Sequence, residues 1–342
     1  MKILLHGWQK NHYVYDGLIE NLGARNVFSY LPLIFNRNYG DTADSFNSED
    51  FTDNLDSFDM IIFTPRSFYD TNFKHFLEHK TSTPKVFLDL EDDFFIRNIY
   101  KHEEIDLYFK RELYTSLQFL STAKWYVRYM YGSQILPPVH RRIGIPQDLI
   151  NSFPYKVAIS DNGQSKLRPF PLTVRIEYPL TTLKEHSAEN DLFFCLTLST
   201  VPDRHRYYRA IKKWSVDGND FKKFISSGGV PKDRYVELLS GSKAAISIRG
   251  MGYDTDRYWE IPRFGSTLFS QKIPIFIEND FVDGESAVFF NNFVDLKNKF
   301  YKYVLRSDEW REIAGAGFKH FVAHHTPKMR IRNSLLNKLN EI

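Results

Sequence analysis

Glycine, carboxylate and arginine side chains gather in one stretch of the sequence, residues 242–269. An apolar run rich in β-branched residues opens it, which predicts a buried strand that stops at Gly250 and Gly252. An acidic run, 254–256, and an amphipathic segment beginning at Arg257 follow, as at the start of a helix. In a strand, glycine turn and helix arrangement, backbone N–H groups and the positive helix end can face a phosphate. The alternative is an ordinary strand-to-helix turn.

Charged side chains beside this turn complete a candidate site for a nucleotide diphosphate. Arg249 precedes the glycines, Arg257 would add charge to a phosphate cradle, and Glu260 could accept a hydrogen bond from a sugar hydroxyl. Asp254 and Asp256 also have the spacing of a metal-binding D-x-D motif. Because they follow a glycine turn, we interpret them as capping the next helix and expect no metal.

A second group of arginines opens the second half of the chain. Arg204, Arg206 and Arg209 follow a predicted strand, 192–198, and lie near the start of a predicted helix. Cations at a helix start oppose the helix dipole at a cost of roughly 0.3–1 kcal/mol, which a bound diphosphate would reverse. We therefore assign these arginines to the candidate donor site.

Four carboxylates follow a predicted strand at 85–89 and are the candidates for a catalytic base. Sites in parallel sheets lie beyond the carboxyl ends of the strands, where a carboxylate could accept a proton from an attacking hydroxyl. The candidates are Asp89, Glu91, Asp92 and Asp93, with a solvated acidic turn or helix cap as the alternative. Lys110 and Arg111, at the end of a later predicted strand, could reach the boundary between two domains.

Alternating strands and helices must position these residues. The first half predicts strands at 2–6, 27–31, 59–64, 85–89 and 107–112. The second half predicts strands at 192–198, 243–248 and 273–277, and helices at 232–240, 295–305, 308–321 and 328–342. This alternation predicts an α/β fold with parallel, doubly wound sheets. Gly7 ends the first strand without a full G-x-G-x-x-G fingerprint, so we do not expect a dinucleotide cofactor.

Length and proline content predict two domains. A chain of 342 residues can bury two cores of ordinary size, and prolines concentrate between residues 134 and 179. We therefore expect an N-terminal Rossmann-like domain at 1–175 and a C-terminal one with closing helices at 176–342.

Composition excludes several classes of protein. A formal net charge of +3 gives no general argument for nucleic-acid binding, and the single cysteine, Cys195, excludes an internal disulfide framework. The N-terminal segment turns polar at His6, too early for a signal peptide, and no window approaches the roughly 18 apolar residues of a membrane span. We expect a cytoplasmic protein without a transmembrane segment.

The C-terminal half resembles glycosyltransferases related to the spore-maturation protein (CgeB-like) family over about residues 232–330. That family has an R-x-x-E-I-P segment, a glycine, an acidic-aromatic stretch and a terminal H-T followed by an arginine. The matching residues here, in the same order, are Arg257-Tyr-Trp-Glu-Ile-Pro262, Gly265, Asp283-Gly-Glu285, His325-Thr326 and Arg330.

A looser likeness is to phage DNA β-glucosyltransferases. These have an early strand ending in glycine, an acidic base after a mid-domain strand, an arginine cluster opening the second domain and an R-x-W-E segment. The matching positions are Gly7, Asp89, the pair Arg204 and Arg206, and Arg257 with Glu260. The spacing around the arginines differs, and the base could equally be Asp92 or Asp93.

Both resemblances imply the GT-B arrangement, in which two Rossmann-like domains face each other across a cleft and the second holds a nucleotide-diphosphate sugar. They imply a hexosyl- or pentosyltransferase whose arginines stabilise the leaving diphosphate without a metal or other cofactor. The expected acceptor is a glycan hydroxyl. The alternatives are hydroxymethylated bases in DNA as acceptor, or a module that binds the nucleotide sugar without catalysis.

Overall fold

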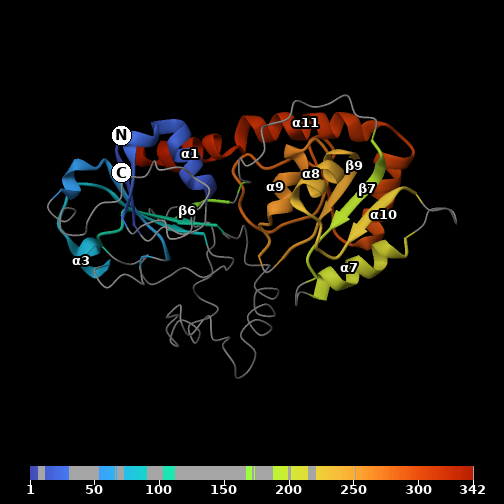
Figure 1. Ribbon diagram of the computed structural model, residues 1–342, viewed down its shortest axis with the longest axis horizontal. Helices are drawn as coiled ribbons and strands as arrows, with labels where there is room; N and C mark the ends of the chain where they lie inside the picture. The colour runs from blue at the N-terminus through green and yellow to red at the C-terminus, as the bar shows by residue number, and fades with distance from the viewer. Residues whose placement is uncertain are drawn as a thin grey trace, which may run out of the picture.

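The protein is described from a computed structural model, which forms two α/β units, each built on a parallel sheet (Figure 1). The described residues are 1–6, 12–30, 54–65, 67, 73–90, 103–111, 167–171, 173, 188–198, 202–214, 221–250 and 252–341. Four candidate site residues, Gly7, Glu91, Asp92 and Asp93, lie outside these ranges.

The first sheet has the strand order β2-β1-β3-β4-β5-β6, with every neighbouring pair parallel. Its strands are β1 (Ile3–His6), β2 (Val27–Tyr30), β3 (Met60–Phe63), β4 (Lys85–Asp89), β5 (Leu107–Lys110) and β6 (Leu167–Pro169), and its helices include α1 (His12–Leu22) and α3 (Phe73–Glu78). β1, β3, β4 and β5 are buried along their whole length, as expected of strands covered on both faces. The strands predicted in this half are confirmed.

The second sheet has the order β11-β10-β9-β7-β8 and is also parallel. Its strands are β7 (Asn190–Cys195), β8 (Lys223–Ser226), β9 (Ser242–Ser247), β10 (Thr267–Gln271) and β11 (Val288–Phe290). Its helices are α7 (Pro202–Lys212), α8 (Lys232–Ser240), α9 (Asp256–Arg263), α10 (Phe293–Phe300), α11 (Glu309–His324) and α12 (Pro327–Arg330). The α/β prediction with parallel sheets is confirmed.

One predicted strand is wrong. Residues 273–277 are not a strand of the sheet, and the strand lies just before them, in β10. Pro274 has no backbone N–H to give to a ladder, whereas 267–270 are fully buried between β9 and β11.

The end of the chain returns to the first unit. In Figure 1 the C-terminal helices run from α11 across to α1, and α12 packs directly on α1. The Asn21 side-chain amide on α1 donates to the carbonyl of Lys328, at 2.9 Å, and Ile331 and Leu335 join the same hydrophobic cluster as Leu18. The predicted domain boundary, between residues 175 and 176, lies outside the described residues.

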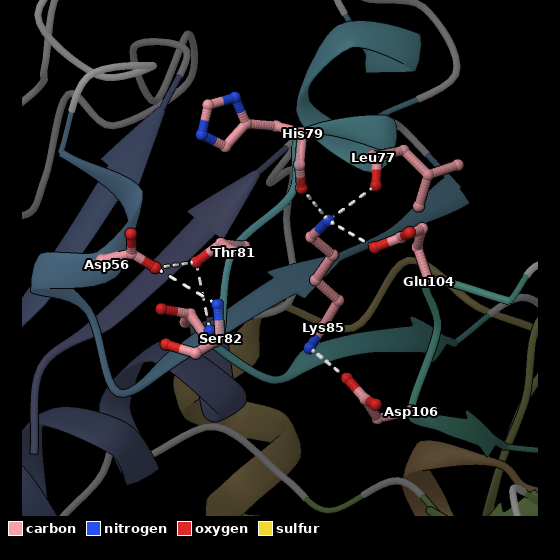
Figure 2. A network of polar contacts seen from close by, with 9 residues as sticks. Asp56, Leu77, His79, Thr81, Ser82, Lys85, Glu104 and Asp106 are labelled. Carbon is pink, nitrogen blue, oxygen red and sulfur yellow. Dashed lines mark hydrogen bonds and ion pairs between the residues drawn. The ribbon is translucent and has the colours of Figure 1, made fainter.

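A buried lysine at the start of β4, Lys85, lies in a network of polar contacts (Figure 2). The Lys85 ammonium, at the start of β4, donates to the carbonyls of Leu77 and His79, at 2.7 and 2.6 Å, and pairs with Glu104 at 3.2 Å. Its backbone N–H donates to Asp106, at 2.8 Å. Every donor of this ammonium has a partner, which is what its burial requires.

Gly17 on α1 tests the packing between the two ends of the chain. A Cβ at this position would lie 2.4 Å from the Pro327 carbonyl oxygen and 2.6 Å from Ile331 Cγ1. We expect Gly17→Ala to lower the free energy of unfolding by about 1–3 kcal/mol because α12 must move away. Urea unfolding measures this, with the exposed Glu20→Ala on the same helix as control. Unchanged or increased stability of Gly17→Ala would contradict the close packing.

Candidate active site

The second sheet reverses its strand order between β7 and β9. The chain leaves β7 to add β8 on one side and then crosses over to place β9 on the other. Ligands of open α/β sheets bind beyond the carboxyl ends of the strands at such a reversal. Thr197 follows β7 there, and Arg249 and Gly250 follow β9.

Arg204 on α7 ties these two strand ends together. Its Nε donates to the carbonyl of Arg249, at 2.9 Å, and its Nη1 donates to the carbonyl of Thr197, at 3.1 Å. A Cβ at Gly250 would lie 2.7 Å from Arg204 Nη2, so the glycine is needed for the guanidinium to fit beneath the turn. The structure therefore brings Arg204 and Gly250 together, as the sequence predicted, with Arg204 buried.

Arg249 points toward the start of α7. Its Nε lies 2.9 Å from a carboxylate oxygen of Asp203, and its guanidinium lies over the Tyr253 ring, 5.3 Å from the centroid. Its backbone N–H donates to the Gln271 side chain, at 3.2 Å. The Arg249 backbone is thus held at its N–H by the Gln271 side chain and at its carbonyl by the Arg204 side chain.

Arg206 and Arg209 lie on the exposed face of α7, away from Arg204. Arg206 is 71% exposed and forms an i,i+3 pair with Asp203, at 2.9 Å. Arg209 donates only to the carbonyl of His205 among its described contacts, at 3.4 Å. Arg206 therefore shares the Asp203 carboxylate with Arg249 from the exposed side of α7, whereas no described contact joins Arg209 to Arg204 or Arg249.

Arg257 and Glu260 lie on α9, directly after the glycine turn. The Nε of Arg257 donates to the carbonyl of Cys195, which places its guanidinium at the end of β7. Glu260 accepts a hydrogen bond from the Tyr235 hydroxyl, at 2.8 Å. Burial raises the pKa of the Glu260 carboxyl, and the nearby Asp256 adds to this. Tyr235 was not predicted, because a tyrosine on a short amphipathic helix carries no distinguishing signal.

The acidic run 254–256 does not cap α9 through an aspartate side chain. Thr255 is the N-cap residue, and its hydroxyl bonds to Ser247, at 3.1 Å. Asp254 is buried and accepts a hydrogen bond from Trp259 Nε1, at 2.7 Å. Within the described ranges, no group of three His, Cys, Asp or Glu side chains could hold a metal ion.

Asp89 lies at the end of β4 with its side chain fully buried. It accepts a hydrogen bond from the Tyr108 hydroxyl, at 2.5 Å, and one of its carboxylate oxygens lies 3.3 Å from Lys110 Nζ, also fully buried. Lys110 lies on the same side of the sheet as Tyr108 and pairs there with Asp89, and whether it reaches the domain boundary stays a prediction. Arg111, the next residue, does reach the second unit, where it contacts Asp254. The role of Asp89 as base stays a prediction.

The contribution of the buried Asp89 and Lys110 pair to stability can be tested. Asp89→Asn removes the carboxylate that lies 3.3 Å from the buried Lys110 ammonium, so we expect it to lower the free energy of unfolding by about 3–5 kcal/mol. The double variant Asp89→Asn with Lys110→Met removes both charges and should recover part of that loss. Urea denaturation of the two variants and the wild type decides. Equal stability of Asp89→Asn and the wild type would show that the pair is not held in solution.

Comparison with known proteins supports a sugar-transfer fold. Residues 194–335 match the family model described as glycosyl transferase-like, a segment that contains Arg204, Arg249, Arg257 and Glu260. No curated protein sequence matches the chain.

Solved structures of Anabaena HepE share the overall fold of this chain. The crystal structure of Anabaena HepE in complex with UDP and glucose matches with a TM-score of 0.55 at 10% identity, over 100% of both chains. T4 phage β-glucosyltransferase in complex with UDP and Mn²⁺ has a TM-score of 0.48 at 12% identity, over 100% of this chain and 99% of that one. At these identities the likeness is one of fold. The chain has the GT-B fold, as the sequence predicted.

No described helix combines the length and the apolar character needed to cross a membrane.

Proposed function

We propose that this protein is a metal-independent, cytoplasmic glycosyltransferase that moves a hexosyl group from a UDP-sugar to an acceptor hydroxyl. The observation that carries the proposal is Arg257. Among the described residues its guanidinium makes one hydrogen bond, through Nε, at the strand reversal of the second sheet. No described residue accepts a hydrogen bond from its two terminal amino groups, which we propose bind the ligand, and Arg257 lies within the glycosyl transferase-like segment.

The diphosphate would bind at the start of α9, against the turn at Gly250 and Gly252. Backbone N–H groups at a helix start and the Arg257 guanidinium stabilise the charge that develops on the leaving diphosphate. Arg204 and Arg249 hold the loop in place, and the Glu260 carboxylate would accept from a ribose hydroxyl while Tyr235 orients it.

The base would be a carboxylate that follows β4. A base must come within hydrogen-bond reach of the proton that it takes, and Asp89 is buried between Tyr108 and Lys110. We therefore favour Asp92 or Asp93 over Asp89. Asp92→Asn or Asp93→Asn should abolish transfer while nucleotide affinity stays within about threefold of the wild type. Full transfer by both variants would return the role to Asp89 or Glu91.

UDP and glucose in the HepE crystal structures support a UDP-hexose as donor here. The acceptor is proposed to be a glycan, because the R-x-x-E-I-P segment and the terminal H-T resemble glycosyltransferases related to the spore-maturation protein family. An acceptor screen separates this from the alternative. Transfer to hydroxymethylated duplex DNA, with affinity that falls steeply as salt is added, would favour DNA.

Nucleotide binding tests the proposal directly. A thermal-shift screen against UDP, GDP, CDP and dTDP, with and without EDTA, should give a shift with UDP that survives EDTA. A ligand at about a hundred times its Kd stabilises by roughly 2.7 kcal/mol. Arg257→Met should abolish the shift, whereas Arg234→Met, which removes an exposed arginine from α8, should not. No shift with any nucleotide would contradict the proposal.

The Glu260 carboxyl makes nucleotide affinity depend on pH. Its raised pKa means that it gains a proton at a higher pH than an ordinary glutamate does, and the protonated group is a weaker acceptor for a ribose hydroxyl. UDP affinity should therefore fall as pH falls through that pKa. Glu260→Gln should bind about 10 to 100 times more weakly at neutral pH and lose this dependence. Calorimetric titrations between pH 4.5 and 7.5 measure both, and a parallel pH profile in the variant would remove Glu260 from the role.

A further inference from the structure

Arg111 contacts both units: Leu90, which directly precedes the candidate base residues in the sequence, and Asp254, in the candidate donor loop. It follows β5 in the first sheet. Its Nη1 donates to the carbonyl of Leu90, at 3.3 Å, and Leu90 directly precedes the acidic segment 91–93 in the sequence. Its Nη2 donates to the backbone carbonyl of Asp254, and its Nε lies 3.5 Å from the Asp254 carboxylate.

Because Arg111 and Asp254 are buried, losing the contact between them is costly. Asp254 is 1% exposed and Arg111 9% exposed, so neither charge has water as a ready alternative partner. Removing one member of a buried pair leaves an uncompensated charge, which is far more costly than losing an exposed pair. If the two units moved apart, Asp254 would keep Trp259 but lose Arg111, because these partners belong to different units.

Asp254 also connects Arg111 to the candidate donor site, because it lies just before α9 in the chain. It lies in the loop between Gly252 and α9, and Trp259 and Glu260 follow on that helix. The contact therefore sets where the start of α9, at which the proposed function places the diphosphate, lies relative to the first sheet. Other groups around this contact are Arg330 and the Tyr13 phenol, both buried and electrostatically coupled to Asp254.

We propose that Arg111 is a positioning residue for sugar transfer. It fixes the carbonyl of Leu90, directly after β4, and the loop before α9 in one geometry, so that acceptor activation and donor departure occur at matched positions. Three of its nitrogens contact two different strand-end loops, which a lysine, with a single ammonium, cannot reproduce. This inference rests on the proposed function, and it concerns the alignment of the two halves and not nucleotide binding itself.

Kinetics of Arg111→Lys and Arg111→Met test the inference. Misplacement by about 1 Å costs on the order of 100-fold in rate, so we expect kcat for transfer to fall about 100-fold in both variants while the UDP Kd stays within about threefold. Asp254→Asn should lower kcat as well, and adding it to Arg111→Met should cause little further loss because both act through one contact. Arg234→Met is the matched control. An unchanged kcat, an equal loss of UDP affinity, or additive losses in the double variant would overturn it.

Solution scattering separates this inference from the proposed function. Small-angle X-ray scattering of the unliganded protein needs no activity, and we expect a larger radius of gyration for Arg111→Met than for the wild type, with unchanged circular dichroism. If the wild type neither binds a nucleotide nor transfers sugar, the proposed function fails, yet the expansion still tests whether Arg111 holds the units together. An identical radius of gyration in the variant and the wild type would show that it does not.

Discussion

The carboxylate of Asp254 is the group on which the arrangement of the whole molecule depends. It is buried, so its charge must be compensated by the protein, and its partners come from both units. Trp259 fixes it to α9, and Arg111 fixes it to the first sheet. The need to compensate this buried charge thus links the loop after β9 to the residue that follows β5 in the other sheet. The packing of α12 on α1 supports the same arrangement from the far end of the chain.

The carboxyl ends of the two sheets carry different charged side chains. The second sheet places Arg204, Arg249 and Arg257 around its strand reversal, where the first two brace the backbone and the third offers its terminal nitrogens. In the first sheet, Asp89 and Lys110 form an internal pair, and for this reason we propose that a carboxylate further along the chain is the base. The proposed function thus places donor binding and acceptor activation on separate units, which buried contacts such as that between Arg111 and Asp254 hold together.

The alternation of apolar runs was enough to predict the parallel α/β fold, and the strand, glycine turn and helix at 242–263 was visible because its signals are local. The side-chain partners that the sequence did not predict are set by tertiary contacts. Lys110 and Arg111 are adjacent basic residues in the sequence, yet Lys110, the last residue of β5, pairs with Asp89, and Arg111, just after β5, contacts Asp254. Arg204 and Arg206 likewise differ only in helix face. The pairing of Asp89 with Lys110 depends on the register between β4 and β5, which residue types alone do not specify.

A crystal structure of the protein with UDP is the most direct test of the central claim, that the strand reversal of the second sheet is the donor site. The account predicts the diphosphate at the start of α9, within hydrogen-bond distance of the Arg257 guanidinium, and the ribose beside Glu260. UDP bound at the first sheet, or at the exposed face of α7 beside Arg206 and Arg209, would contradict the account.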